Sequence, residues 1–175
     1  MSEIQHHARL PAGGADLAGA SASGMRVMLD ASALLKRYAS EAGHERVLDL
    51  FAQADGLLVA AHCQSEVAAA LLRRRRDGCL PKAEFERVWA AARSDVADMV
   101  RVPLDDHVER FAYAAMDHEP LRVTDALHVG SALAANVDLF VTADRRLAQV
   151  ARAMGLPAEC LDAAVEMTRE EVMNP

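Results

Sequence analysis

Short apolar runs alternate with longer helical patterns along this chain, and that alternation is the strongest constraint on its fold. Runs of strand type lie at residues 25–29, 57–61, 100–104 and 138–142, and the last lies within residues 155–161. Between them, apolar residues recur every three or four positions, as in helices that bury one face. Strands that alternate with helices pair in parallel and need cover on both faces. The sequence therefore predicts one α/β domain with a mainly parallel sheet.

Length and charge exclude several classes of protein. The 175 residues suffice for one domain with a substantial core, and the net charge of −7 excludes a protein that coats nucleic acid by bulk electrostatics. No apolar run reaches the roughly 18 residues that suggest a membrane helix. The three cysteines lack CxxC spacing, which favours neither a disulfide framework nor a structural zinc site. A cytoplasmic protein fits best.

The two ends of the chain differ from its middle. Residues 1–24 are rich in Ala, Gly and Ser and lack the basic start and apolar core of a secretory signal. We expect them to be a disordered N-terminal extension, with Met25 as a candidate for the natural start. Residues 162–175 have the pattern of a polar helical tail. The functional domain is therefore expected to span residues 25–161.

Carboxylates stand where the predicted strands give way to helices. Asp30 directly follows residues 25–29, Asp144 closely follows the fourth run, and Glu66 lies in the first turns of the helix after the second. Asp125 begins a further helix. Such an Asp can simply complement the helix dipole, which is worth roughly 0.3–1 kcal/mol. Its repetition at the strand ends, where open α/β sheets bind ligands, favours a shared site.

Two hydroxyl residues are expected to cap these helices. Thr124 is the predicted N-cap before Asp125, and Ser32 is the predicted N-cap that leaves Asp30 free to face a ligand. Ser32 and Thr142 also stand beside two of the acids, where they could position a water or hold a carboxylate. Local capping and strand propensity explain these two hydroxyls equally well.

Four carboxylates in one site would require either protonation or a bound cation. Two unit charges 4 Å apart repel by about 4 kcal/mol at an effective dielectric constant near 20. Oxygen ligands with room for water select Mg²⁺, or Mn²⁺, over zinc. Such an ion activates water and neutralises phosphate oxygens, so the pattern indicates phosphoryl chemistry.

Other polar residues near these junctions have simpler explanations. Asp105 and Asp106 follow the third run together and are expected to cap a helix. His62 lies four residues before Glu66 and is expected to have a structural or solvent role. His128 lies three residues after Asp125 and is expected to pack behind the site.

A run of four arginines closes the helix that carries Glu66, at Arg73, Arg74, Arg75 and Arg76. The run is either a solvated last turn that complements the helix dipole or a contact for a phosphate backbone. Its distance along the helix, up to roughly 15 Å from Glu66, suits a passing substrate strand but not the chemistry.

Four stretches of the chain resemble the PIN domains, and especially the VapC-type toxin ribonucleases of bacterial toxin–antitoxin pairs. They are MLDASALLKRY at Asp30, SEVAAAL at Glu66, LRVTDALHVGSAL at Asp125 and DLFVTADRRLAQVARAMGL at Asp144. The resemblance covers roughly residues 25–161. It implies a three-layer α/β/α sandwich around a five-stranded sheet. It also implies that those four acids are the catalytic metal ligands, with Thr142 and Ser32 as the accompanying hydroxyls.

The resemblance further implies a Mg²⁺-dependent endoribonuclease that acts as a toxin, usually as a homodimer, and is inhibited by a cognate antitoxin. Two alternatives are a non-catalytic interaction module of the same fold and another phosphotransfer domain. An aspartyl phosphatase usually has a second Asp where this chain has Ser32. A receiver domain needs a Lys where this chain offers Arg145. The RNA target does not follow from the sequence.

Overall fold

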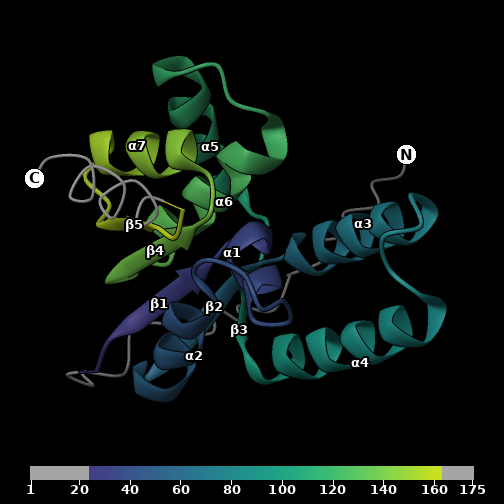
Figure 1. Cartoon of the computed structure of the whole chain (residues 1–175). Coiled ribbons are helices and arrows are strands. Elements are labelled where there is room, and N and C mark those ends of the chain that lie inside the picture. Colours follow the sequence, from purple (N-terminus) through teal and green to yellow (C-terminus); the bar gives the residue numbers. More distant parts are fainter. Residues whose placement is uncertain (1–23, 163–175) are drawn as a thin grey trace, which may run out of the picture.

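The computed structural model describes residues 24–162, in which five parallel strands form one sheet between two layers of helices (Figure 1). The strands are β1 (Arg26–Leu29), β2 (Gly56–Ala60), β3 (Val100–Val102), β4 (Leu139–Thr142) and β5 (Ala158–Cys160). Their order in the sheet is β3-β2-β1-β4-β5, and every neighbouring pair is parallel. This confirms the predicted fold class.

The helices divide between the two faces of the sheet. One face is covered by α1 (Ala31–Lys36), α2 (His44–Gln53), α3 (Cys63–Arg76) and α4 (Lys82–Asp98). The other face is covered by α5 (Asp106–His118), α6 (Val123–Ala134) and α7 (Arg145–Ala153). Figure 1 shows α3 and α4 extending together away from the sheet. The predicted three-layer sandwich is thus confirmed.

The central strand explains why the sheet could be recognised from apolar runs. In β1, Val27 and Leu29 belong to the core beneath α1–α4, whereas Met28 belongs to the core beneath α5–α7. All three side chains are fully buried. A strand that is buried on both faces has a continuous apolar sequence rather than an alternating one. Full burial of each such side chain stabilises the fold by about 1.5–3 kcal/mol.

A close contact between α5 and α6 fixes the helix that carries Asp125. A Cβ atom added at Gly130 of α6 would lie 2.6 Å from the backbone oxygen of Val108 in α5. Real Cβ contacts are never that short, so a larger residue would push the two helices apart. Gly130 therefore allows α6, which carries Asp125, to pack closely against α5.

Two helices begin at different residues from those predicted. The N-cap of α1 is Asp30, whose Oδ1 accepts a hydrogen bond from the backbone N–H of Ala33, and Ser32 already lies inside the helix. The N-cap position of α6 is Arg122, without a side-chain cap, so Thr124 is not the cap either. Both hydroxyls are engaged elsewhere, Ser32 with Asp30 and Thr124 with Glu66. The predicted cap at Asp105 is confirmed.

The expectations for the chain ends concern residues 1–23 and 163–175, which lie outside the described residues. They include the disordered extension and the polar helical tail. Between residues 24 and 162, no helix combines the length and the apolar character that crossing a membrane requires.

Candidate active site

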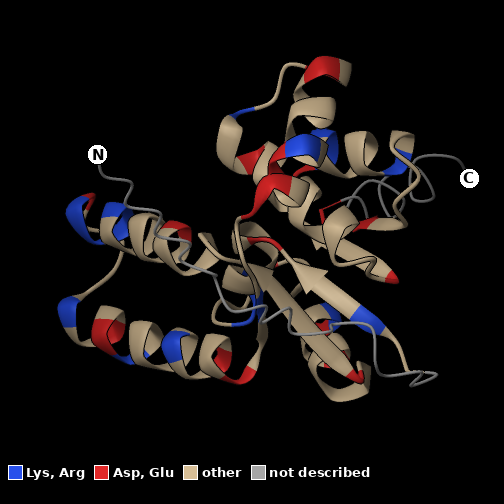
Figure 2. Ribbon diagram, turned by 180° about the vertical axis from the view of Figure 1, so that it is seen from behind, with Lys and Arg blue, Asp and Glu red and all other residues tan. Residues whose placement is uncertain are grey.

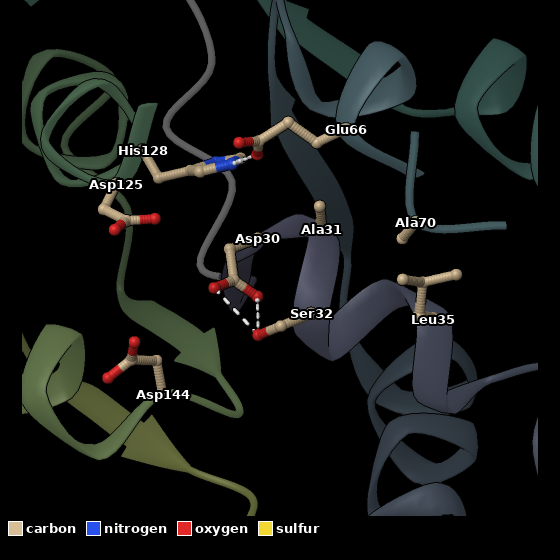
Figure 3. A pocket seen from close by; sticks show the side chains of 9 residues that line it. All are labelled: Asp30, Ala31, Ser32, Leu35, Glu66, Ala70, Asp125, His128 and Asp144. Carbon is tan, nitrogen blue, oxygen red and sulfur yellow. Dashed lines mark hydrogen bonds and ion pairs between the residues drawn. The ribbon is translucent and has the colours of Figure 1, made fainter. Parts of the chain in front are cut away.

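All four predicted carboxylates line one open pocket of about 210 Å³ (Figure 3). Asp30 directly follows β1 and Asp144 follows β4, and these two strands pair side by side, with Leu29 opposite Val141. From β1 the chain continues to β2 and β3 on one side of the sheet and later to β4 and β5 on the other. Open α/β sheets form a ligand crevice at such a reversal of strand order. The full lining is Asp30, Ala31, Ser32, Leu35, Glu66, Ala70, Asp125, His128 and Asp144.

Asp30 is the most buried acid and is held on both oxygens. Its side chain accepts hydrogen bonds from Ser32 Oγ at 2.7 Å, from the Ala33 N–H at 2.7 Å and from Thr142 Oγ1 at 2.6 Å. Burial raises the pKa of Asp30, while the charge of His128 and these hydrogen bonds oppose the rise. Since three donors point at it, the carboxylate is fixed in one orientation as an acceptor.

The two hydroxyls join the two strand ends to each other. Thr142 Oγ1 donates to Asp30 and accepts a hydrogen bond from the Asp144 N–H at 2.9 Å. Ser32 Oγ donates to Asp30 and accepts from the Ala143 N–H at 2.9 Å. The sequence allowed these hydroxyls to position a water or to hold a carboxylate, and the observed hydrogen bonds are those of holding a carboxylate. A role for either hydroxyl in the chemistry stays a prediction.

Glu66 reaches the pocket from the first turn of α3 and is held by neighbours on other segments. His128 Nε2 lies 2.5 Å from Glu66 Oε2, and His62 Nε2 lies 3.8 Å from the same oxygen. Burial alone would raise the pKa of Glu66, but the hydrogen bonds from His128 and Thr124 and the two imidazole charges lower it overall. Glu66 is therefore ionised at neutral pH.

Asp125 and Asp144 complete the set. Burial raises the pKa of Asp125, and the negative charges of Glu66 and Asp144 raise it further. This is the repulsion that the sequence predicted for acids in one site. Asp144 also caps α7, and both cap bonds use Oδ1, which leaves Oδ2 out of the cap. Its role as a helix cap and its place in the pocket are therefore compatible.

The donor set fits a hard divalent cation. Four carboxylates share the pocket, and at least Asp125 is affected by the negative charge of its neighbours. In the part of the chain that the structure describes, the one group of three ligand atoms within 4.8 Å of each other is His62, Glu66 and His128, so the acids are spread more widely. A hard divalent cation that keeps several of its waters suits such spacing.

Sequence reasoning underestimated the two histidines. His128 is buried, as expected, yet it lines the pocket and contacts Glu66 rather than packing behind the site. The His62 and His128 rings lie 4.3 Å apart between centroids. The i, i+4 spacing of His62 and Glu66 and the i, i+3 spacing of Asp125 and His128 were the available signals.

The arginines lie apart from the pocket. Arg73, Arg74, Arg75 and Arg76 form the exposed last turn of α3, and basic residues gather at that far end of the helix (Figure 2). Arg74 lines a second groove, between α1, α3 and α4. Seven residues separate Glu66 from Arg73, or about 10 Å along the helix.

Comparison with known proteins gives one family and a shared fold. The PIN domain family model matches residues 27–153, whereas no curated protein sequence matches the chain. VapBC2 from Rickettsia felis, bound to a DNA fragment from its promoter, has a TM-score of 0.58 and 13% identity, covering 78% of this chain and 98% of that one.

Two structures from Mycobacterium tuberculosis are also similar. VapC20, described as a sarcin–ricin loop cleaving toxin, has a TM-score of 0.56 and 17% identity, with 74% and 95% of the two chains covered. VapBC-5, a member of the VapBC family of toxin–antitoxin systems, has a TM-score of 0.54 and 17% identity, with 78% and 97% covered. At such identities the similarity establishes the fold alone.

Proposed function

The chain belongs to the PIN domain family, and from that premise we propose that it is a metal-dependent endoribonuclease acting as the toxin of a toxin–antitoxin pair. The observation that carries the proposal is the convergence of Asp30, Glu66, Asp125 and Asp144, from four separate segments, on one pocket. Similar structures described as a sarcin–ricin loop cleaving toxin and as a member of a toxin–antitoxin family support the substrate class and the biological role.

The four acids would hold Mg²⁺, or alternatively Mn²⁺, which when bound supplies an activated water and neutralises charge on the phosphate oxygens. The chain itself contributes fixed carboxylates. Ser32 and Thr142 orient Asp30, and His128 orients Glu66. Because these groups are oriented before substrate arrives, little reorganisation is needed during the reaction.

The four arginines concentrate positive charge at the end of α3, on a chain whose net charge is negative. With a net charge of −7, the protein must bind RNA through a local basic surface. We propose that Arg73, Arg74, Arg75 and Arg76 contact phosphates of a strand that runs along α3 towards the pocket. All four are exposed, as such contacts require.

The remaining parts of the proposal concern organisation. We propose that residues 25–161 form the nuclease domain, that the protein is a cytoplasmic homodimer, and that its partner is a cognate antitoxin. Similar structures belong to VapBC systems, which supports an antitoxin as the partner. Co-expression with the product of an adjacent reading frame should abolish toxicity if that product is the antitoxin.

The direct test is incubation of the full chain with labelled RNA in Mg²⁺, in Mn²⁺ and in EDTA. We expect cleavage with either ion and none in EDTA. Restoring Mg²⁺ in excess over EDTA should restore cleavage, which separates loss of the ion from loss of the fold. Equal cleavage in EDTA would contradict a metal-dependent mechanism. A folded protein that never cleaves RNA would instead support a non-catalytic interaction module.

A further inference from the structure

Two imidazoles flank the Glu66 carboxylate on one wall of the pocket. His128 Nε2 and His62 Nε2 lie 2.5 Å and 3.8 Å from Glu66 Oε2, and one ligand atom from each of the three side chains lies within 4.8 Å of the other two. Figure 3 shows the His128 ring against Glu66, with the other carboxylates on the remaining sides of the pocket. The three side chains thus form a compact group inside the wider acid cluster.

The surroundings of His128 indicate that its ring serves the pocket. The side chain is only 2% exposed, and its Nδ1 has no hydrogen-bond partner among the described residues. Buried polar atoms in native proteins are almost always paired, so this unpaired nitrogen is exceptional. The hydrogen bond of this imidazole is on the Nε2 side, where it faces Glu66.

We propose that His62, Glu66 and His128 form a binding site for a transition-metal ion such as Zn²⁺, beside the acid site and sharing Glu66 with it. Two imidazoles and one glutamate are a recurring ligand set of catalytic zinc sites. Imidazole nitrogen suits zinc, whereas the oxygens of Asp30, Asp125 and Asp144 suit magnesium or manganese. The pocket therefore has one set of ligands that suits zinc and another that suits magnesium or manganese.

Small movements would complete the site. With bonds of about 2.0–2.1 Å, two ligands of a tetrahedral zinc ion lie roughly 3.4 Å apart. The 3.8 Å between His62 and Glu66 is close to that value, whereas the 2.5 Å between His128 and Glu66 must open by about 1 Å. The ion takes the place of the Nε2 proton of each imidazole, and each neutral ring then carries its one proton on Nδ1.

His62 must also exchange one contact for another. Its Nε2 lies 3.1 Å from the Thr124 backbone oxygen, and this hydrogen bond is lost when the nitrogen turns to the ion. The net loss of one such hydrogen bond is small beside the free energy of zinc binding. The side chains of His62 and Glu66 are 23% and 28% exposed, so both have room to turn.

A consequence follows for activity, and it rests on the proposed function. Zinc bound to Glu66 competes with magnesium for that carboxylate. Zn²⁺ should therefore inhibit RNA cleavage, and excess Mg²⁺ should relieve the inhibition only at concentrations far above that of zinc.

The test measures binding of the metal alone, with Co²⁺ as a visible probe and Zn²⁺ as its competitor. The full chain is used, with His6→Gln and His7→Gln as the common background, because these adjacent histidines could bind metal themselves. The parent should give the visible absorption of low-coordinate Co²⁺, and Zn²⁺ should abolish it. His62→Gln and His128→Gln should each lower Zn²⁺ affinity at least about 100-fold, since even outer-shell changes cost 10–100-fold.

Two controls keep the result interpretable. Asp144→Asn removes an acid of the pocket without touching the three ligands and should lower Zn²⁺ affinity by less than about tenfold, the lower end of outer-shell effects. His62→Gln alters a partly exposed side chain and should fold normally, so the test does not depend on the buried His128. A thermal melt of each variant without metal checks the fold.

The opposite pattern would overturn the inference. If both histidine variants keep the parent's Zn²⁺ affinity while Asp144→Asn loses it, the ion binds among the acids. If the parent binds Zn²⁺ no more tightly than Mg²⁺, the ion likewise binds among the acids. RNA cleavage by the parent in Mg²⁺ without zinc tests the proposed function separately. If the parent does not cleave RNA, a zinc site that depends on the histidines is still supported. If the zinc site is absent, the proposed nuclease activity is still supported.

Discussion

Two junctions between a strand and a helix have almost the same local structure but different surroundings. After β3, Asp105 Oδ1 accepts hydrogen bonds of 3.0 Å from the backbone N–H groups two and three residues later. After β4, Asp144 Oδ1 accepts the corresponding bonds at 2.8 and 3.1 Å. Asp144 lines the pocket of the four carboxylates, and Asp105 is not among its lining residues.

The difference arises from the order of strands in the sheet. β4 is hydrogen-bonded to β1, so its end lies beside Asp30, whereas β3 is an edge strand separated from β1 by β2. The same local cap therefore forms at both junctions. Whether that cap also faces a ligand depends on which strands pair, and distant parts of the chain determine this.

The largest expected difference between the two junctions is in catalysis. Asn is as good an N-cap as Asp, so Asp105→Asn and Asp144→Asn both keep the cap and change the charge. We expect Asp144→Asn to lower the rate of RNA cleavage at least about 100-fold, as loss of a metal ligand should. Asp105→Asn should cleave RNA at the parent's rate.

Single-turnover cleavage of labelled RNA in saturating Mg²⁺ measures both variants. Comparable loss in the two variants would show that Asp144 acts only as a cap, and the proposed site would lose one of its four acids. An undiminished rate in both would lead to the same conclusion.

The next difference is in stabilisation by metal. An ion bound only by the folded state stabilises it by RT ln(1 + [L]/Kd), about 2.7 kcal/mol at a hundredfold excess over Kd. Mg²⁺ should therefore raise the melting temperature of the parent and of Asp105→Asn, and should raise that of Asp144→Asn much less. Thermal melts at a series of Mg²⁺ concentrations measure this. Equal shifts in all three proteins would mean that the ion binds elsewhere.

The same comparison extends to the basic residues of the helices. Arg74 and Arg75 lie on α3, which starts at the pocket, whereas Arg110 lies on α5, which is capped by Asp105. Replacing Arg74 and Arg75 by Gln should lower the salt slope of RNA binding by about 0.7 for each lost phosphate contact with a single strand. A double variant at Arg93 and Arg110 removes the same charge and should leave the slope close to the parent's.

RNA affinity at several salt concentrations, measured with the catalytically inactive Asp144→Asn in both backgrounds, gives the slopes. If the two double variants have equal slopes, Arg74 and Arg75 do not contact RNA phosphates. They then only form a solvated last turn that complements the helix dipole.

Much of the fold followed from the sequence because its signals are local. After the exposed Arg26, β1 is apolar because both of its faces are buried, and its predicted range differs from the observed one by a single residue. The cap at Asp105 was also correct. The cap at Ser32 was wrong because Asp30, which is an equally good cap, takes that position. The cap at Thr124 was wrong because α6 begins earlier, after Arg122, without a side-chain cap. Tertiary contacts with Asp30 and Glu66 engage the two hydroxyls instead.

The histidine contacts could not be predicted in the same way. His128 and Glu66 are 62 residues apart and belong to α6 and α3, which cover opposite faces of the sheet. Only the packing of those helices around the strand ends brings the two side chains together. The convergence of the four acids was predictable because each acid stands near a strand end or a helix start, and parallel strands end at the same edge.

A smaller effect concerns the stability of the two caps. Asp105→Ala should destabilise the metal-free protein by about 1 kcal/mol, which is typical for loss of an N-cap. Asp144→Ala should cost less, because removing its charge also relieves Asp125, whose pKa its charge helps to raise. Denaturant unfolding in EDTA measures both. A larger loss for Asp144→Ala would mean that repulsion within the pocket is negligible.

The smallest expected effect is a difference in pH dependence between the parent and Asp125→Asn. Burial, followed by the charges of Glu66 and Asp144, raises the pKa of Asp125 in the folded state, so this group binds its proton more tightly in the folded than in the unfolded chain. Its contribution to stability is thus fully present below the ordinary Asp pKa of 3.8 and is lost as the pH rises through the raised value. Glu66 has the opposite sign and Asp30 the same sign, but both remain in the variant. Relative to the parent, metal-free Asp125→Asn should therefore gain stability as the pH rises from about 4 to 7. Urea unfolding in EDTA across that range tests it, and parallel profiles would show that Asp125 does not sense the other carboxylates.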